Sequence, residues 1–210
     1  MISNYEKTKR QMQAVFAGEA DSAAECFGLE SDGSYVYLTF LGRECRISRE
    51  DGMAEIRKSA GADYEEADFE IALSLYDMLS RTNARIVPSG CLVSMQQLAT
   101  QMRAVTAPSN SGFYGGLAAL FDHREEDLKN ALRSIGAVPV PGADVSADVD
   151  VFRGLKLQFR FWCSDEEFAP QIQFFWDSCV LEHMHYETVW YVNGAFLDIL
   201  RDEFKAQTAD

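Results

Sequence analysis

Three successive carboxylates, Asp165, Glu166 and Glu167, are the residues of this chain whose types and spacing most directly suggest chemistry. Adjacent carboxyl groups push each other's pKa values apart, so such a run can supply a general acid and a general base. The same oxygens can also bind a hard cation. A run of this kind is more often a solvated loop, with Asp165 capping a turn. We take these three residues as the candidate catalytic group. The alternative interpretation is a solvated loop without a catalytic role.

The side chains next to this loop indicate a binding site. Trp162 precedes the loop, Phe168 follows it, and Arg160 shares a strand face with Trp162. A pocket rimmed by Arg160, Trp162 and a loop carboxylate could hold a small ligand. The alternative is that Trp162 packs between the sheet and a helix. We take Arg160, Trp162 and Phe168 as the candidate ligand-binding residues.

The other candidate motifs are incomplete. His183 and His185 could share a metal on a strand, but on a helix they would point about 200° apart. The neighbouring sequence indicates a turn entering a helix, so we predict no metal site. Gly115-Gly116 lacks the strand and lysine of a phosphate-binding loop. Carboxylates near Cys163 would raise the pKa of its thiol and weaken it as a nucleophile. The sequence leaves any cofactor unknown.

Alternating strands must position the acidic loop. Leu155, Leu157, Phe159 and Phe161 point to one side of a strand, and Lys156, Gln158, Arg160 and Trp162 point to the other. Ile172, Phe174 and Trp176 continue the alternation after the loop, and Val145–Val151 alternate before it. Arg153-Gly154 is typical of a hairpin turn. The pattern predicts a three-stranded antiparallel meander packed on helices.

Helices and one further hairpin surround this meander. Ser3 and Glu6 form a capping-box pattern for a helix ending near residue 18, and Asp122 and Glu125 form another for a helix ending at Gly136. Further helices are expected at 21–28, 68–80, 95–102, 114–121 and 186–205, with a loop at 107–112. Strands at 34–40 and 44–48 form a hairpin. Residues 49–64 fit no clear pattern, and a helical piece is one interpretation.

Composition limits the partners. The chain has 210 residues, 47% of them apolar, which is enough for a substantial core in one domain covering residues 1–210. Its net charge of −14 repels nucleic acid and anionic lipid. No apolar run is long enough to span a bilayer. We therefore expect the partner to be a small molecule or a protein of unknown identity. A homo-oligomer is a further possibility.

The cysteines and the first residues point to the cytoplasm. Cys26, Cys45, Cys91, Cys163 and Cys179 are odd in number and scattered, without a C-x-x-C pair. This spacing favours free thiols, several of them buried, over a disulfide framework. The opening residues, MISNYEKTKR, lack the apolar core of a secretory signal.

The segment around the acidic loop resembles an uncharacterised prokaryotic family, domain of unknown function 3786. The specific match is Phe161-Trp162 followed by Asp165-Glu166-Glu167-Phe168, and weaker matches are Gly142-Ala143-Asp144, Phe175-Trp176-Asp177 and Phe40-Leu41-Gly42-Arg43. The likeness covers about residues 30–200 and implies a common fold rather than a reaction. Some relatives carry an amino-terminal cysteine cluster of the iron–sulfur kind, which this chain lacks.

Together these features predict an α+β domain with an antiparallel sheet of about four to six strands packed by helices. The function that we expect is a non-catalytic accessory domain that binds a small ligand or a partner protein. Two alternatives remain: an enzyme that uses Asp165, Glu166 or Glu167 for acid–base chemistry, and a structural or oligomerising module.

Overall fold

The computed structural model describes residues 3–81, 86–101 and 114–208. The chain divides into two units, each built around a five-stranded antiparallel sheet. Unit 1 comprises Met1–Val87 and Val180–Ala195, and unit 2 comprises Pro88–Cys179 and Phe196–Asp210. The α+β class predicted from the sequence is confirmed, but the strands are shared between two sheets where one was expected. The described helices include no segment with the length and apolar character of a transmembrane span.

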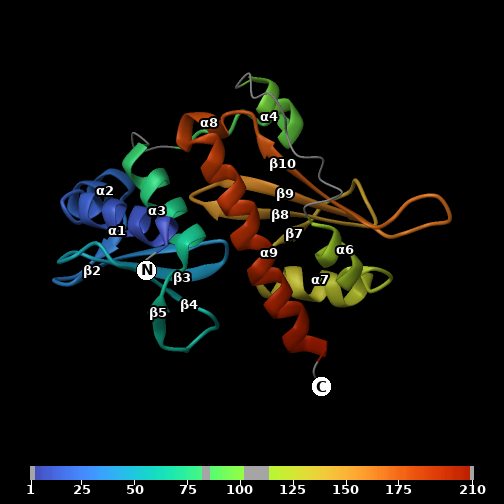
Figure 1. The fold of residues 1–210 in the computed structure, drawn as a ribbon, viewed down its shortest axis with the longest axis horizontal. Helices are drawn as coiled ribbons and strands as arrows, with labels where there is room; N and C mark the ends of the chain where they lie inside the picture. Colours follow the sequence, from blue (N-terminus) through green and yellow to red (C-terminus); the bar gives the residue numbers. More distant parts are fainter. Residues whose placement is uncertain (1–2, 82–85, 102–113, 209–210) are drawn as a thin grey trace. The chain divides into compact units, whose positions relative to one another are not determined.

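Unit 1 combines a meander with helices. Its sheet has the order β1 (Glu30–Ser31), β2 (Tyr35–Phe40), β3 (Arg43–Ser48), β4 (Ala54–Arg57) and β5 (Tyr64–Glu66). Its helices are α1 (Asn4–Ala17), α2 (Ala20–Phe27), α3 (Phe69–Arg81), α8 (Val180–His183) and the first part of α9 (Tyr186–Thr208). Figure 1 shows α1, α2 and α3 gathered on one face of this sheet.

The sequence pattern explains how unit 1 folds. Ser3 caps α1, as predicted, by accepting a hydrogen bond from the amide of Glu6 at 3.1 Å. Along β2, alternate residues are buried, and the turn into β3 places Leu41 and Gly42 at φ values of 50° and 74°. Two successive left-handed residues make the tight turn that joins twisted antiparallel strands.

The segment at 49–64 contains strands, so the helical interpretation was wrong. Residues Ala54–Arg57 pair with β3, with Cys45 opposite Ile56, and β5 then pairs with β4. Pairing with a neighbouring strand thus decides the structure where the local pattern is weak. Gly52 precedes β4 with φ +76°, and a Cβ there would overlap the carbonyl oxygen of Gln13 in α1. Only glycine fits this approach of two backbones.

Asp77 of α3 holds the start of α9. Its carboxylate accepts the His185 amide at 2.8 Å and the Thr188 hydroxyl at 2.6 Å, and it lies 2.6 Å from His185 Nδ1. A carboxylate at a helix start satisfies amides that have no partner within the helix and complements the helix dipole. His185 is therefore part of a helix cap, as the turn-to-helix interpretation of residues 183–185 implied.

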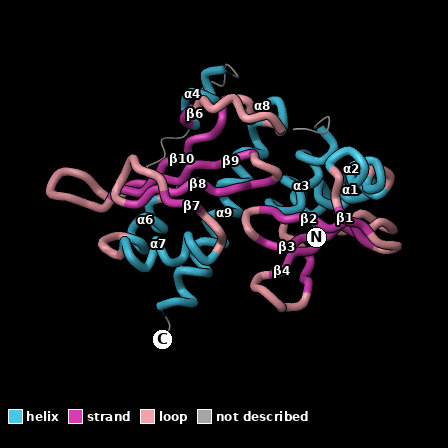
Figure 2. Tube along the Cα trace, turned by 180° about the vertical axis from the view of Figure 1, so that it is seen from behind, coloured by secondary structure: helices cyan, strands magenta, loops and turns pink. Residues whose placement is uncertain are grey.

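Unit 2 contains the predicted meander. Its sheet has the order β6 (Leu92–Ser94), β10 (Gln171–Asp177), β9 (Leu155–Trp162), β8 (Val145–Phe152) and β7 (Val138–Pro139). Its helices are α4 (Met95–Gln101), α6 (Gly115–Phe121), α7 (Glu125–Ser134) and the second part of α9. In Figure 2, α6 and α7 lie on one side of these strands. Residues 102 and 107–112, part of a predicted helix and a loop, lie outside the described residues.

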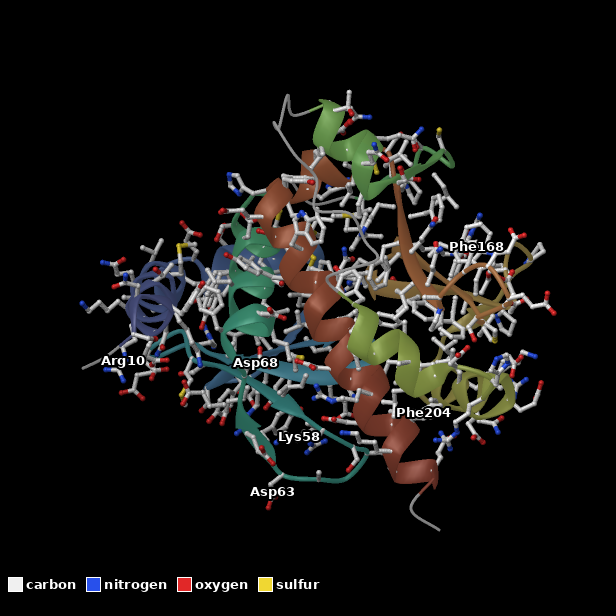
Figure 3. All side chains as sticks on the ribbon, turned by 45° about the vertical axis from the view of Figure 1, so that its right-hand side comes forward. Arg10, Lys58, Asp63, Asp68, Phe168 and Phe204 are labelled. Atoms are coloured by element: carbon white, nitrogen blue, oxygen red, sulfur yellow. The ribbon has the colours of Figure 1, made fainter. Side chains whose placement is uncertain are left out.

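Aromatic rings form the core of unit 2. The four apolar residues of β9 that the sequence placed on one face are all fully buried. The ring of Phe196 on α9 lies 5.5 Å from that of Phe159 and 5.9 Å from that of Phe174. The ring of Phe204, labelled in Figure 3, lies 4.9 Å from that of Phe121 on α6. The helices thus cover one face of the sheet, and the other face holds the polar side chains.

Asp177, at the end of β10, fixes the chain that enters β6. Its carboxylate accepts hydrogen bonds from the amides of Ser89 (3.0 Å), Gly90 (2.9 Å) and Cys179 (3.0 Å), and from the Ser89 hydroxyl (2.7 Å). The residue is 4% exposed. A buried carboxylate with this many donors is well satisfied. Asp177, one of the residues that carry the family resemblance, therefore has a structural role.

Candidate functional site

An open pocket of about 560 Å³ lies where β9 ends and β10 begins. Trp162 and Gln171 are paired across the two strands, and both point away from the buried core. The loop at 163–170 joins the strands and extends past their ends in Figure 2. The residues that line the pocket are Asp144, Trp162, Cys163, Ser164, Asp165, Phe168, Ala169, Gln171 and Gln173.

Asp165 shapes the tip of this loop. Its Oδ1 accepts hydrogen bonds from the amides of Glu167 at 2.8 Å and Phe168 at 2.7 Å. The Asp165 amide in turn donates to the Phe168 carbonyl at 3.0 Å. This is the turn-capping geometry that aspartate adopts in tight turns. It holds Phe168, labelled in Figure 3, at the pocket with 60% of the residue exposed.

Two more carboxylates anchor the start of the loop. Asp144 accepts the Cys163 amide at 2.8 Å, and Asp122 accepts the Ser164 amide at 2.8 Å and its hydroxyl at 2.7 Å. The side-chain hydrogen bond from Ser164 is the largest of the effects that lower the pKa of Asp122. The pocket wall is therefore held from three separate segments of unit 2.

The structure brings together part of the predicted site. Trp162, Asp165 and Phe168 line the pocket, whereas Glu166 and Glu167 are exposed and lie outside its lining. Arg160 lies on the same sheet face, opposite the lining residue Gln173, but it is not itself among the lining residues. Its Nε donates to Gln158 at 2.7 Å, and its guanidinium carbon lies 4.3 Å from the centre of the Phe175 ring.

Sequence reasoning missed the segment that carries Asp122 and His123. The capping box predicted for Asp122 and Glu125 does not form, because α7 begins at Glu125 and Asp122 binds Ser164 instead. Nε2 of His123 lies 3.1 Å from the Ser164 hydroxyl, 41 residues along the chain. A single sequence carries no signal for a contact at that separation. The lining residues Gln171 and Gln173 could have been predicted from the sequence, since the strand alternation places them on the same face as Trp162.

The protons of this cluster show what chemistry it supports. The single proton of the Ser164 hydroxyl is donated to Asp122, so the His123 imidazole is not placed to remove it. The Cys163 thiol donates to Glu125 at 3.2 Å. Burial and the Glu125 carboxylate raise the pKa of Cys163. A hydrogen bond with the His123 backbone lowers the pKa, but its effect is outweighed. Neither side chain is an activated nucleophile in this arrangement.

The donor atoms of Asp122, His123 and Cys163 lie within 4.8 Å of one another. Among the described residues, these three form a group of side chains that could together bind a metal ion. His183 and His185 belong to no such group of described residues. His183 is buried, and His185 caps α9. The five cysteines all lie in the described residues, and no disulfide joins them.

The comparisons with known proteins identify a family. The model of the domain of unknown function DUF3786 matches residues 19–198, which include the pocket, the 163–170 loop and all the described strands of both sheets. Neither the curated proteins nor the solved structures gave a match. The resemblance seen at Trp162–Phe168 thus extends over most of the chain. This chain belongs to the family of the domain of unknown function DUF3786.

Proposed function

We propose that this protein is a non-catalytic cytoplasmic domain that binds a small molecule in the pocket beside Trp162. The observation that carries the proposal is the composition of the pocket wall. Trp162 and Phe168 offer aromatic surface, and Gln171 and Gln173 offer amide donors and acceptors. Ligand sites commonly combine an apolar platform with a few polar groups that fix orientation. Aromatic side chains that remain exposed in a pocket are suited to stacking on a flat ligand face.

The charge of the pocket narrows the class of ligand. Asp144 and Asp165 contribute carboxylates to the lining, and no lysine or arginine is among the described lining residues. An anionic ligand would be repelled by these groups and by the net charge of −14. The pocket therefore favours a neutral or cationic molecule with one flat apolar face and several hydrogen-bonding groups.

Native mass spectrometry of protein purified from its own host, beside a denatured control, tests the proposal. We expect a non-covalent adduct of defined mass that is lost on denaturation. Trp162→Ala and Phe168→Ala should remove the adduct. Tyr5→Ala is the matched control, because Tyr5 is 66% exposed in unit 1 and does not line the pocket. An adduct that survives both pocket substitutions would refute this site.

An enzyme remains the second candidate because Asp165 reaches the pocket wall. One oxygen of Asp165 already accepts two amides, so acid–base work would fall to the other oxygen. Asp165→Asn keeps an oxygen for the turn and removes the charge. If the protein turns over the ligand found in the pocket, this substitution should abolish turnover and leave binding in place, whereas unchanged turnover would exclude Asp165 as the acid or base.

A further inference from the structure

The cluster at the pocket wall joins three kinds of metal ligand. Asp122 and His123 follow α6, Cys163 follows β9, and their donor atoms lie within 4.8 Å of one another. His123 adopts a left-handed backbone conformation, with φ 54°. This conformation is uncommon for residues other than glycine, and it occurs here where the imidazole is held 3.1 Å from Ser164.

We propose that Asp122, His123 and Cys163 form a binding site for a divalent transition metal of the zinc type. A thiolate, an imidazole and a carboxylate are the ligand types that zinc takes in proteins. Bonds of about 2.0–2.3 Å in a tetrahedron put ligand atoms roughly 3.3–3.8 Å apart. The observed separations are close enough for small side-chain rotations to complete that geometry. Calcium and magnesium would instead require a set of oxygen ligands.

The surroundings suit a cation. Ser164 orients one of the three ligands, since its hydroxyl donates a hydrogen bond to the Asp122 carboxylate. Partners of this kind orient metal ligands. Glu125 accepts a hydrogen bond from the Cys163 thiol, and Asp144 accepts one from the Cys163 amide. The nearby cation Arg124 is bound to Asp127 at 2.8 Å.

The charge balance is simple. The metal displaces the thiol proton of Cys163, which is released to solvent, and a sulfur–metal bond replaces the sulfur–hydrogen bond. The thiolate and the Asp122 carboxylate together neutralise the two charges of the ion. Three protein ligands leave at least one coordination position for water or another molecule. Cys163 lines the pocket, so this position would lie at the wall of the proposed ligand site.

Cobalt(II) is the probe, because a cobalt–thiolate bond gives a charge-transfer band in the near ultraviolet. We expect chelator-treated protein to bind one cobalt ion with this band, and zinc to abolish it by competition. Cys163→Ala should remove the band. His123→Ala should weaken binding by at least about 100-fold, and Ser164→Ala by about 10-fold, since orienting partners cost 10- to 100-fold.

Cys91→Ala is the matched control, because Cys91 is an exposed cysteine of the same unit and lies outside the cluster. It should keep the band and the affinity. Circular dichroism of each variant without metal shows whether it is folded. A folded wild type without the band at millimolar cobalt, or a band that persists in Cys163→Ala, would overturn the proposal. The probe is the metal alone, so this test is independent of whether the pocket binds an organic ligand.

Discussion

Replacing Asp177 with alanine should destabilise unit 2 by about 3–4 kcal/mol, because three backbone amides lose their acceptor. The Cys179 amide is buried, so water cannot replace the carboxylate, and its loss costs about 2 kcal/mol. The amides of Ser89 and Gly90 belong to exposed residues, and each contributes roughly 0.5–1 kcal/mol. The Ser89 hydroxyl adds little, since it also contacts the Ser178 hydroxyl at 2.9 Å.

The same carboxylate predicts a dependence on pH. Burial raises the pKa of Asp177, but hydrogen bonds from Cys179 and Ser89 outweigh burial and hold it well below its usual range. An aspartate in an unfolded chain has a pKa of about 3.9. The stabilisation is therefore fully present above about pH 4 and is lost as the pH falls toward the pKa of the folded state. The difference between wild type and Asp177→Ala should shrink over that interval.

Urea unfolding, followed by circular dichroism and tryptophan fluorescence, measures the loss of stability. Hydrogen exchange locates it, and the Cys179 amide should lose most of its protection in the variant. Asp63→Ala is the control, because Asp63, labelled in Figure 3, is an exposed aspartate for which the same change should leave stability within error. Unchanged protection of the Cys179 amide in Asp177→Ala, or a stability change below about 0.5 kcal/mol, would refute the reasoning.

Three further predictions concern unit 1. Gly52→Ala should cost more than about 3 kcal/mol by urea unfolding, whereas Gly61→Ala, with a similar φ and open space around it, should cost only about 1 kcal/mol; equal costs would contradict the overlap with α1. Tyr76→Phe should cost about 1–2 kcal/mol, because the buried hydroxyl donates to the Gly52 carbonyl at 2.8 Å. Burial raises the pKa of Tyr76 to about 12, so the wild type should lose stability relative to this variant as the pH rises from about 10 to 12. In an absorbance titration at 295 nm, the variant should show one tyrosine fewer among those that ionise above about pH 10. Asp77→Ala should cost about 1–2 kcal/mol and Thr188→Val less, with faster hydrogen exchange at the start of α9; an unchanged exchange rate there would argue against the cap.

The meander could be predicted from the sequence because its signals are local. Alternation with period two places Leu157 and Phe159 inside, and the positive φ values of Arg153 and Gly154 confirm the predicted hairpin turn. The same pattern does not say what covers the buried face. For that reason the strands of the meander and of the hairpin at 34–48 could be located along the chain, while the short strands beside them and the division into two sheets could not.

The candidate site was predicted only where it is local. Trp162, Asp165 and Phe168 are neighbours in the sequence, and all three line the pocket. The Asp122–His123 segment reaches Ser164 through the packing of α6 and α7 on the sheet, which a local pattern does not encode. The direction of the Arg160 side chain was also open from the sequence, because the half-buried Phe175 on the neighbouring strand β10 could attract its guanidinium away from the pocket, and in the structure the guanidinium lies over the Phe175 ring.

The edge strands of both sheets are short, and this limits how two copies of the chain can associate. The inner strands β8 and β9 have 8 residues each, whereas the edge strands β1 and β7 have 2 and β5 and β6 have 3. Pro139 in β7 has no amide hydrogen to offer, and β5 presents Glu65 and Glu66 to solvent. Edges of this kind resist the strand-to-strand joining that leads to aggregation. A homo-oligomer of this protein would therefore have to assemble through side-chain surfaces rather than through a continuous intermolecular sheet formed by its described strands.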